Sequence, residues 1–222
     1  MKPITFLLSL LLCLTLSAKK DKQTRVELFT SKGTIVLKLY NETPIHRDNF
    51  IKLVKEGYFN DLLFHRVIED FMIQGGDPDS RDAAPGKLLG EGDPGYTLPA
   101  EIRFPQIYHK RGVLAAAREG DQTNPERRSS GSQFYIVWGK TFNREEIEKI
   151  AAHVERTTGY IMPEDLKTYY MHYGGTPHLD GAYTVFGEVV KGIEVVNAIQ
   201  QVATDRNDRP IEDIKILSAK IK

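Results

Sequence analysis

Residues 64–77, FHRVIEDFMIQGGD, hold polar side chains that two ordinary short strands would not need. Arg66 lies near the start of this stretch, and Gln74 ends an apolar run just before two glycines. Arginine stays protonated under ordinary conditions and presents rigid planar donors. A glutamine amide supplies donors and an acceptor together, which suits a peptide backbone. The two residue types therefore indicate a surface that binds a peptide through hydrogen bonds.

Strand parity predicts which side chains share this surface. Successive side chains of a strand point to opposite faces, so Met72 and Gln74 share one face. By the same rule, Gln133 and Tyr135 share a face of a later strand. If both faces border one groove, it contains two amides, a thioether and an aromatic ring. Phe71, Met72 and Tyr135 could then line an apolar slot of proline size.

The same residues have ordinary alternatives. Arg66 could be a surface residue in an ion pair with Glu69 or Asp70, both close by in the sequence. Phe71 and Met72 could be core residues, because a methionine beside an aromatic ring usually reflects packing. The choice depends on the rest of the chain.

Other catalytic motifs are missing from the sequence. The six histidines show no metal-ligand spacing: a Gly-Gly turn separates His172 from His178, and no carboxylate completes a ligand set. There is no Gly-x-Ser-x-Gly nucleophile motif and no phosphate-binding loop of the P-loop type. The serine-rich segment 129–132 lacks an obvious base partner. Metal, nucleophilic and nucleotide chemistry are therefore not predicted.

The elements that must position these residues are mostly β-prone. Val26–Thr30 and Thr34–Tyr40 flank a short glycine-containing connection, which predicts a hairpin. Residues 75–99 are rich in Gly, Pro and Asp and predict a long ordered loop rather than strand or helix. Further strands are predicted at Gly112–Ala117, Ser132–Val137, Tyr183–Val190 and Ile211–Ile221.

Helical periodicity appears in three places. One helix is predicted to begin near Pro44 and to end near Gly57, and another spans Gly192–Gln200. Between Trp138 and Thr176 the pattern is helical throughout. Asn143 can cap a first helix there, whose apolar positions are Ile147, Ile150, Ala151 and Val154. Pro163 opens a second run, with Leu166, Tyr169, Tyr170 and Tyr173 at the same spacing before Gly174-Gly175.

The composition and the N-terminal segment indicate where in the cell or outside it the protein is located. Lys+Arg and Asp+Glu both total 30, so no net field draws the chain to nucleic acid or to an anionic membrane. Residues 1–18 have a basic start, a short apolar stretch and small residues at the end, the layout of a secretory signal peptide. The only cysteine, Cys13, lies inside this segment. We therefore expect an exported chain, periplasmic or secreted after cleavage, with no disulfide and no membrane span in its mature form.

Several segments together resemble the cyclophilin-type peptidyl-prolyl cis–trans isomerases. The resemblance covers about residues 25–222 except the helical insertion at 138–176, and it is most like secreted or periplasmic bacterial members. The matching segments are FHRVIEDFMIQGGD (64–77), GVLAAA (112–117), GSQFYI (131–136) and HLDGAYTVFGEVV (178–190).

The resemblance implies both a fold and a set of roles. The fold is all-β with helices: a closed eight-stranded antiparallel barrel capped by two helices, interrupted by the insertion. Arg66 would be the catalytic residue that donates a hydrogen bond to the prolyl nitrogen, without any cofactor or metal. Substrate binding would fall on Phe71, Met72, Gln74, Ala117, Gln133, Tyr135, Leu179 and Tyr183, with Arg118 and His178 as further candidates.

The sequence departs from the family pattern at the proposed groove. Tyr135 stands where many members have phenylalanine, which adds a hydroxyl at the pocket floor. His178 occupies a position often taken by tryptophan, a residue linked to cyclosporin binding. Tyr183 replaces a frequent histidine, and Arg118 follows Ala117 where asparagine is common.

Two functions are compatible with this resemblance. The first is an isomerase, expected to act as a monomer, that accelerates rotation about Xaa–Pro bonds and assists the folding of exported proteins. Its partners would be proline-containing peptides and unfolded or exported proteins. The alternative is a proline-peptide binding module or chaperone with little turnover, for which the insertion is the motivating feature.

Overall fold

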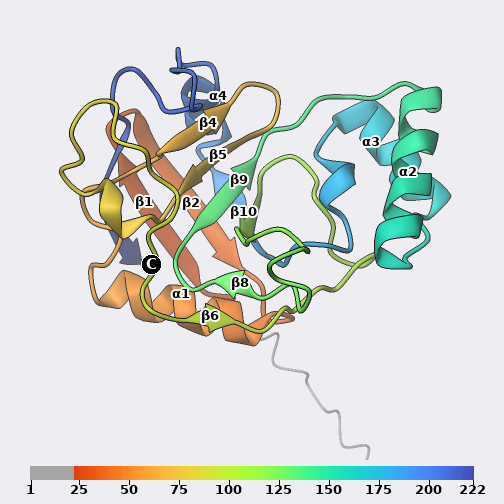
Figure 1. The fold of residues 1–222 in the computed structure, drawn as a ribbon, viewed down its shortest axis with the longest axis horizontal. Helices are drawn as coiled ribbons and strands as arrows, with labels where there is room; N and C mark the ends of the chain where they lie inside the picture. The colour runs from red at the N-terminus through yellow and green to blue at the C-terminus, as the bar shows by residue number, and fades with distance from the viewer. Residues whose placement is uncertain (1–22) are drawn as a thin grey trace, which may run out of the picture.

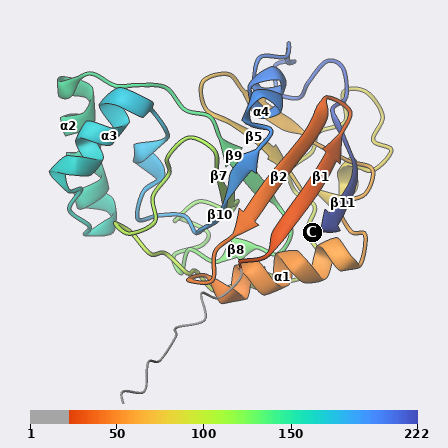
Figure 2. The same ribbon diagram turned by 180° about the vertical axis from the view of Figure 1, so that it is seen from behind.

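The computed structural model describes residues 23–222, so the predicted signal peptide, residues 1–18, lies outside the described range. Within that range, no helix is both long and apolar enough to cross a membrane. The main element is one curled sheet of antiparallel strands with helices around it (Figures 1 and 2). Its strands are β1 (Arg25–Thr30), β2 (Gly33–Leu39), β3 (Leu62–Leu63), β4 (Arg66–Ile68), β5 (Met72–Gly75), β7 (Val113–Ala116), β9 (Phe134–Val137), β10 (Val185–Lys191) and β11 (Lys215–Ile221).

The order of the strands explains the curvature of the sheet. It runs β3-β11-β1-β2-β10-β7-β9-β5-β4. The two end strands, β3 and β4, are separated only by Phe64 and His65, so both edges of the sheet lie on one short chain segment. The prediction of an all-β fold with helices is confirmed. The predicted count of eight strands is approximate, since it holds when β3 and β4 are taken as one interrupted strand.

The interior of the sheet is filled by aliphatic and aromatic side chains. In β1 and β2 the buried residues include Val26, Leu28 and Leu37, and the predicted hairpin is confirmed. Phe50 and Phe59 each meet Phe134 edge to face, with ring centroids 5.5 Å apart in both pairs. Such tilted aromatic pairs contribute about 0.5–1.5 kcal/mol beyond the area that they bury.

Two helices cover the ends of the curled sheet, as predicted. Helix α1 (Pro44–Lys55) packs against β10 and β11, and helix α4 (Ile193–Gln200) packs against β2, β4 and β5. Figure 1 shows α1 along the bottom of the sheet and α4 at its top. Both helices turn a buried apolar side to the sheet, including Phe50 and Leu53 in α1 and Val196 in α4.

The segment predicted to be helical contains α2 (Arg144–Thr158) and α3 (Glu164–Tyr173), which stand beside the sheet (Figure 1). Helix α2 begins at Asn143 with a reciprocal capping box: Asn143 accepts from the Glu146 amide, and the Glu146 side chain accepts from the Asn143 amide. Along the predicted apolar stripe, Ile147 and Val154 are fully buried. The segment leaves and rejoins the sheet where Lys140 pairs with Gly175.

These two helices share a core of their own. The buried members of this cluster are Phe104, Ile147, Ala151, Val154, Met162, Leu166 and Tyr170. The predicted stripe of α3 ends one turn early, because Tyr173 is 64% exposed at the last turn of the helix. Tyr170, one turn earlier, is 0% exposed, and its hydroxyl reaches Asp180.

Two sequence predictions need correction. The loop over 75–99 contains a short 3-10 helix, η1 (Pro78–Ser80), and the strand β6 (Thr97–Leu98), which pairs with β8 (Ser129–Ser130). The last strand begins at Lys215 rather than at Ile211. Residues 205–213 form a turn in which Asp205 accepts the amides of Asn207 and Arg209, and this turn uses the backbone groups that a strand would need.

Candidate active site

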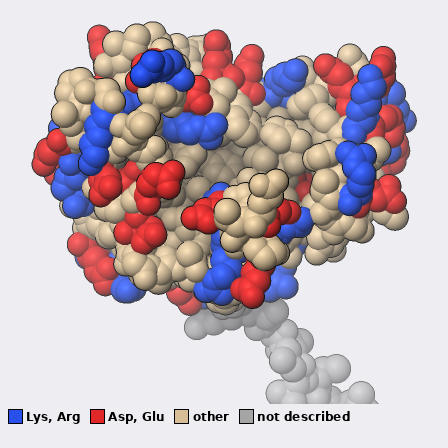
Figure 3. All heavy atoms as spheres, viewed as in Figure 1, with Lys and Arg blue, Asp and Glu red and all other residues tan. Residues whose placement is uncertain are grey.

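A cavity of about 270 Å³ opens beside β4, β5 and β9. In the space-filling view the surface is hollowed between the sheet and the α2–α3 segment, and acidic and basic side chains are interspersed over this face (Figure 3). The second wall comes from the 3-10 helix η2 (Pro177–Leu179) and the residues after it. Nine of the predicted site residues line the cavity: Arg66, Phe71, Met72, Gln74, Ala117, Arg118, Tyr135, Leu179 and Tyr183.

Strand register brings the polar and apolar residues of the cavity together. Arg66 on β4 pairs with Gln74 on β5, and Gln74 pairs in turn with Tyr135 on β9. The β4–β5 turn is tight, and Asp70 adopts a left-handed backbone with a φ of 56°. Its amide donates to Gln200 Oε1 of α4 at 2.7 Å, which fixes the turn to the helix. The predicted sharing of faces by these strands is thus present in the structure.

Arg66 lies at the border of the cavity, where its side chain is 42% exposed. Its Nε atom lies 3.3 Å from Asp208 Oδ2, so its ion pair is neither with Glu69 nor with Asp70. Its Nη1 atom is 3.5 Å from Gln74 Oε1. Within residues 23–222, no hydrogen bond engages its Nη2 group, which leaves donors for a ligand. A half-exposed ion pair of this kind contributes only about 0–1 kcal/mol.

A chain of amides continues from the arginine along one rim. Gln74 Nε2 donates to Gln133 Oε1 at 3.0 Å. Gln133 Nε2 donates to the carbonyls of Gly90 and Gly92 at 2.7 and 2.8 Å. Gln133 therefore lies outside the first cavity and lines a neighbouring one of about 360 Å³. Gln133 orients Gln74, and its own donors are used by the loop.

The floor of the cavity is apolar. Met72 and Tyr135 are buried and belong to one hydrophobic cluster, against which Phe71, Leu179 and Tyr183 pack with partial exposure. The extra hydroxyl of Tyr135 does not face the cavity, because it lies 3.0 Å from Nε2 of the buried His109. Burial raises the pKa of Tyr135 well above its ordinary value, and the phenol stays neutral. The aromatic ring is what a ligand meets.

The two further candidates, His178 and Arg118, lie at the border of the site. The His178 ring packs on Phe71 with centroids 5.4 Å apart, and His178 is absent from the cavity lining. The Arg118 side chain is nearly buried: its Nε donates to the Ala182 carbonyl at 2.8 Å, and its Cζ lies 4.4 Å from the Tyr183 ring centroid. Arg118 thus closes one wall by bracing Tyr183.

The residues on one side of the cavity were not predicted from the sequence. Buried His65 lines it, and burial lowers the pKa of His65 to about 4 although the charge of Asp77 opposes this. The loop around Leu88 also contributes, and buried Arg209 holds this loop by donating to the carbonyls of Ala84 and Lys87. His65 lies inside the stretch 64–77, but its residue type and spacing do not indicate a place in the cavity, and Arg209 belongs to no motif, so only the three-dimensional contacts reveal these two residues.

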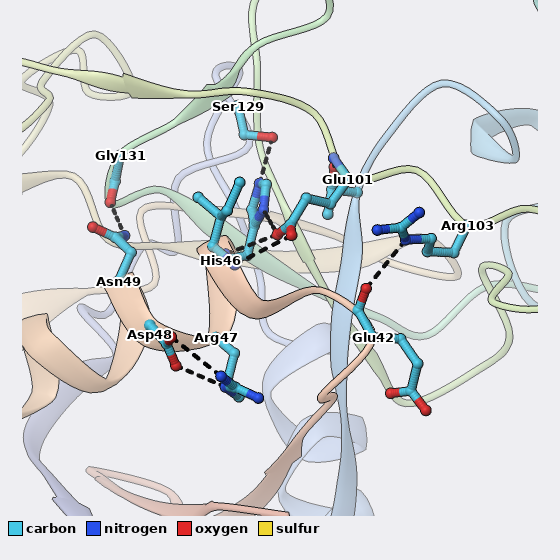
Figure 4. A network of polar contacts seen from close by, with 11 residues as sticks. Glu42, His46, Arg47, Asp48, Asn49, Glu101, Arg103, Ser129 and Gly131 are labelled. Carbon is cyan, nitrogen blue, oxygen red and sulfur yellow. Dashed lines mark hydrogen bonds and ion pairs between the residues drawn. The ribbon is translucent and has the colours of Figure 1, made fainter.

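A second polar cluster lies apart from this cavity and resembles an acid–base–nucleophile set (Figure 4). His46 Nδ1 is 2.7 Å from Glu101 Oε2, and His46 Nε2 is 2.9 Å from Ser129 Oγ. Ser129 therefore does have a base partner, contrary to the sequence prediction. Glu101 also accepts the Ile45 and His46 amides and so caps α1, a role that Thr43 does not perform.

This second cluster is closed to a substrate. Ser129 is 1% exposed and His46 is 2% exposed. Burial lowers the pKa of His46 despite the neighbouring Glu101, so the ring is neutral and Nε2 can accept the serine proton in a hydrogen bond. The contacts tie α1, β8 and residue 101 together. Within residues 23–222, no group of three or more His, Cys, Asp and Glu side chains is arranged to hold a metal ion.

Comparisons with known proteins place this geometry in a family. The family model described as "Cyclophilin type peptidyl-prolyl cis-trans isomerase/CLD" matches residues 25–221. A putative peptidyl-prolyl cis-trans isomerase of Staphylococcus haemolyticus is 33% identical over 204 residues, which cover 91% of this chain and 93% of that protein. Peptidyl-prolyl cis-trans isomerase-like 2 of Rhizopus delemar is 34% identical over 204 residues, covering 89% of this chain but only 29% of that protein.

The solved structures agree in fold. A crystal structure of a Cryptosporidium parvum cyclophilin type peptidyl-prolyl cis-trans isomerase superposes with a TM-score of 0.63 at 26% identity, covering 90% of this chain and 98% of that one. A second crystal structure of that protein, in the presence of the dipeptide Ala-Pro, gives a TM-score of 0.61 at the same identity and covers 89% and 98% of the two chains.

Proposed function

The chain belongs to the cyclophilin-type peptidyl-prolyl cis–trans isomerases, and from this premise we propose that it uses Arg66 to accelerate rotation about Xaa–Pro bonds of exported proteins. The proposed mechanism follows from the position of Arg66, which borders a cavity whose floor is formed by Met72 and Tyr135. A proline ring packed on that floor would bring its nitrogen to the guanidinium. The related Cryptosporidium isomerase was crystallised with Ala-Pro, a ligand of this chemistry.

The barrier to be lowered is electronic. Amide resonance gives the C–N bond partial double-bond character and a rotational barrier of roughly 18–20 kcal/mol. As the bond twists, the nitrogen lone pair leaves the conjugated system and becomes available to a donor. A hydrogen bond from Arg66 is then stronger in the twisted state than in either planar state, so it stabilises the transition state selectively.

The other residues of the cavity keep the twisted bond in place. Met72, Phe71 and Tyr135 provide the apolar surface for the ring, and Leu179 forms the opposite wall. The Gln74 amide lies between Arg66 and Gln133, where it can meet the substrate backbone and limit the motion of the guanidinium. No proton is transferred in this mechanism and no covalent intermediate forms, so an arginine suffices.

The mechanism is tested by replacing the donor. Arg66→Ala is expected to lower kcat/KM for a proline tetrapeptide by about 100-fold or more, as for loss of a single transition-state donor elsewhere. Arg66→Lys should recover only part of the rate, because an ammonium lacks the planar fork. The assay is cis-to-trans isomerisation with thermal unfolding measured in parallel.

The matched control is Arg81→Ala. Arg81 is an exposed arginine that donates to the carbonyls of Tyr58 and Asn60, away from the cavity, so its loss should leave kcat/KM within twofold. A wild-type rate no faster than that of Arg66→Ala would refute the proposal. If both proteins then bound the peptide equally well, the chain would be a proline-binding module with little turnover.

The proposal that the clients are exported rests on the sequence of residues 1–18. It predicts that the full chain, produced with a C-terminal tag in a bacterial host, is recovered outside the cytoplasm with an N-terminus at Ala18 or Lys19. Mass spectrometry of the tagged protein checks this directly. Recovery of the uncleaved chain in the cytoplasm alone would contradict it, without affecting the assignment of Arg66.

A further inference from the structure

A buried chain of hydrogen bonds leads from the cavity floor to helix α3. The Tyr135 hydroxyl lies 3.0 Å from His109 Nε2. His109 Nδ1 lies 2.9 Å from Asp180 Oδ1, and the His109 amide donates to the same oxygen at 2.8 Å. The Tyr170 hydroxyl donates to Asp180 Oδ2 at 2.7 Å. We refer to Tyr135, His109, Asp180 and Tyr170 as the tyrosine relay.

The carboxylate fixes the direction of the hydrogen bonds around it. A carboxylate only accepts, so His109 Nδ1 carries a proton and donates it to Asp180. The other ring nitrogen, Nε2, makes its hydrogen bond with the Tyr135 hydroxyl. Each member therefore depends on the next. Removal of the Tyr170 hydroxyl leaves Asp180 Oδ2 without a donor, and that change reaches Tyr135 through one histidine.

All four members are shielded from water. Tyr170 is 0% exposed, and His109 and Asp180 are each 1% exposed. A buried polar group that loses its partner is destabilising, because water cannot reach it to replace that partner. Networks in such surroundings hold their side chains in one arrangement.

The relay reaches the proline cavity from two sides. Tyr135 contributes the ring on the floor, and Asp180 directly follows Leu179, which lines the wall. Asp180 also ends η2, where its amide donates to the Pro177 carbonyl at 3.1 Å. Asp180 therefore connects two parts of the pocket. Its carboxylate binds His109, which lies beneath the cavity floor, and Asp180 itself belongs to the turn that contains the wall residue Leu179.

The glycines at the C-terminal end of helix α3 allow the helix to pack closely against the segment around His109. Gly175 has a φ of 141°, and a Cβ there would lie 2.8 Å from the Tyr170 ring, so no larger residue fits. The Thr176 amide donates to the His109 carbonyl at 2.9 Å, and Gly175 pairs with Lys110. The end of α3 and the segment around His109 are thus one packed unit.

From this geometry we propose that Tyr170, Asp180 and His109 are positioning residues that set the distance between the floor and the wall of the proline pocket. The α2–α3 segment then forms part of the scaffold of the active site through Tyr170. This inference rests on the proposed function, because it concerns the same pocket. It gives a residue of the helical segment a specific effect on isomerisation.

The first test removes one hydroxyl at the far end of the relay. Tyr170→Phe is expected to lower kcat/KM for a proline tetrapeptide about fivefold, which corresponds to about 1 kcal/mol. Tyr169→Phe is the matched control: Tyr169 is the preceding residue of α3, its ring packs on Tyr108 and Tyr170, and within residues 23–222 its hydroxyl makes no hydrogen bond. Its kcat/KM should stay within twofold of wild type. Equal rates for the two variants would overturn the proposal.

The second test separates positioning from general destabilisation. In a Tyr135→Phe background the relay no longer reaches the floor ring and acts on the pocket only through the wall, so Tyr170→Phe should then lower kcat/KM by clearly less than fivefold. A structural defect would instead give the same factor in both backgrounds. The same fivefold factor in both backgrounds would therefore overturn the proposal even if the first test succeeded.

A third variant keeps the test decisive if Tyr170→Phe does not fold. His109→Asn retains a donor near the Nδ1 position for Asp180 and loses the Nε2 contact to Tyr135, so it should show the same fivefold loss, again clearly smaller in the Tyr135→Phe background. A loss of the same size in both backgrounds would refute positioning. Failure of the proposed function looks different, because the wild type would then be no faster than Arg66→Ala.

Discussion

Two buried histidines hold nearly the same set of partners in this protein, but only one of them, His109, contacts a residue that lines the cavity. His109 binds a carboxylate of Asp180 through Nδ1 and a hydroxyl through Nε2. His46 binds Glu101 through Nδ1 and the Ser129 hydroxyl through Nε2. The contact distances lie between 2.7 and 3.0 Å in both cases.

The difference lies in what the hydroxyl belongs to. Ser129 is a buried residue of β8, and its cluster joins α1 to β8 and to Glu101. Tyr135 carries its hydroxyl on a ring that lines the candidate cavity. The same acid–histidine–hydroxyl arrangement therefore stabilises the fold in one region and shapes a binding surface in the other. Residue types alone do not distinguish the two, whereas access to a cavity does.

Neutralising the carboxylate in each cluster is expected to give the largest effect. Asp180→Asn and Glu101→Gln should each lower the free energy of unfolding by about 3 kcal/mol, because each leaves buried donors without an acceptor. Only Asp180→Asn should also lower kcat/KM per folded molecule. Chemical denaturation gives the first quantity, and isomerisation assays on the folded fraction give the second.

The comparison would fail in either of two ways. A loss of kcat/KM in Glu101→Gln equal to that in Asp180→Asn would mean that both clusters act through stability alone. An unaffected kcat/KM in both variants would mean that neither cluster shapes the cavity. Comparing the variants at equal distance from their own unfolding midpoints removes the trivial effect of partial unfolding.

A third buried histidine extends the comparison to pH. His65 is 3% exposed, and within residues 23–222 neither ring nitrogen has a hydrogen-bond partner. Its pKa falls from 6.5 to about 4 because burial disfavours the charged ring. The unfolded chain takes up this proton below pH 6.5 while the folded chain does not, so stability is full above pH 6.5 and declines toward pH 4.

The expected size follows from the shift. At about pH 5 the loss is about 2 kcal/mol, since one pKa unit corresponds to about 1.4 kcal/mol. His65→Phe removes one titrating ring and should make the profile of unfolding free energy between pH 6.5 and 5 shallower by this amount. A profile as steep as that of the wild type would assign the pH dependence to other groups, of which His46 and His178 are the candidates because desolvation also lowers the pKa of each.

Local patterns in the sequence predicted most of the fold. The β1–β2 hairpin, helices α1 and α4, and the Asn143 cap of α2 all depend on residues within one or two turns of each other, so periodicity and capping rules suffice. The two-residue strands β6 and β8 were missed because they are too short for any alternation to show. The onset of β11 was misplaced because the Asp205 turn depends on specific side-chain hydrogen bonds.

The residues of the site also divide into those that local patterns predicted and those that they did not. Strand parity grouped Met72 with Gln74, and the family resemblance added Arg66, which lies on the same hairpin. The relay was not predicted, because His109 and Asp180 are 71 positions apart in the chain and His109 and Tyr135 are 26 apart. His46 and Ser129, 83 positions apart, were missed for the same reason. Contacts over such separations follow from the curled path of the sheet and not from any local spacing.

The smallest expected effect gives the most direct contrast between the two clusters. Each of the variants Ser129→Ala and Tyr135→Phe removes only the hydroxyl that contacts the histidine of its own cluster. Each should lower the unfolding free energy by about 1 kcal/mol. Ser129→Ala should leave kcat/KM within twofold, since its cluster has no surface on the cavity. Tyr135→Phe should lower kcat/KM, because the freed ring can shift along the floor toward Leu179. A larger kinetic effect in Ser129→Ala than in Tyr135→Phe would reverse the roles assigned to the two histidines, and would make the closed cluster the one that governs the groove.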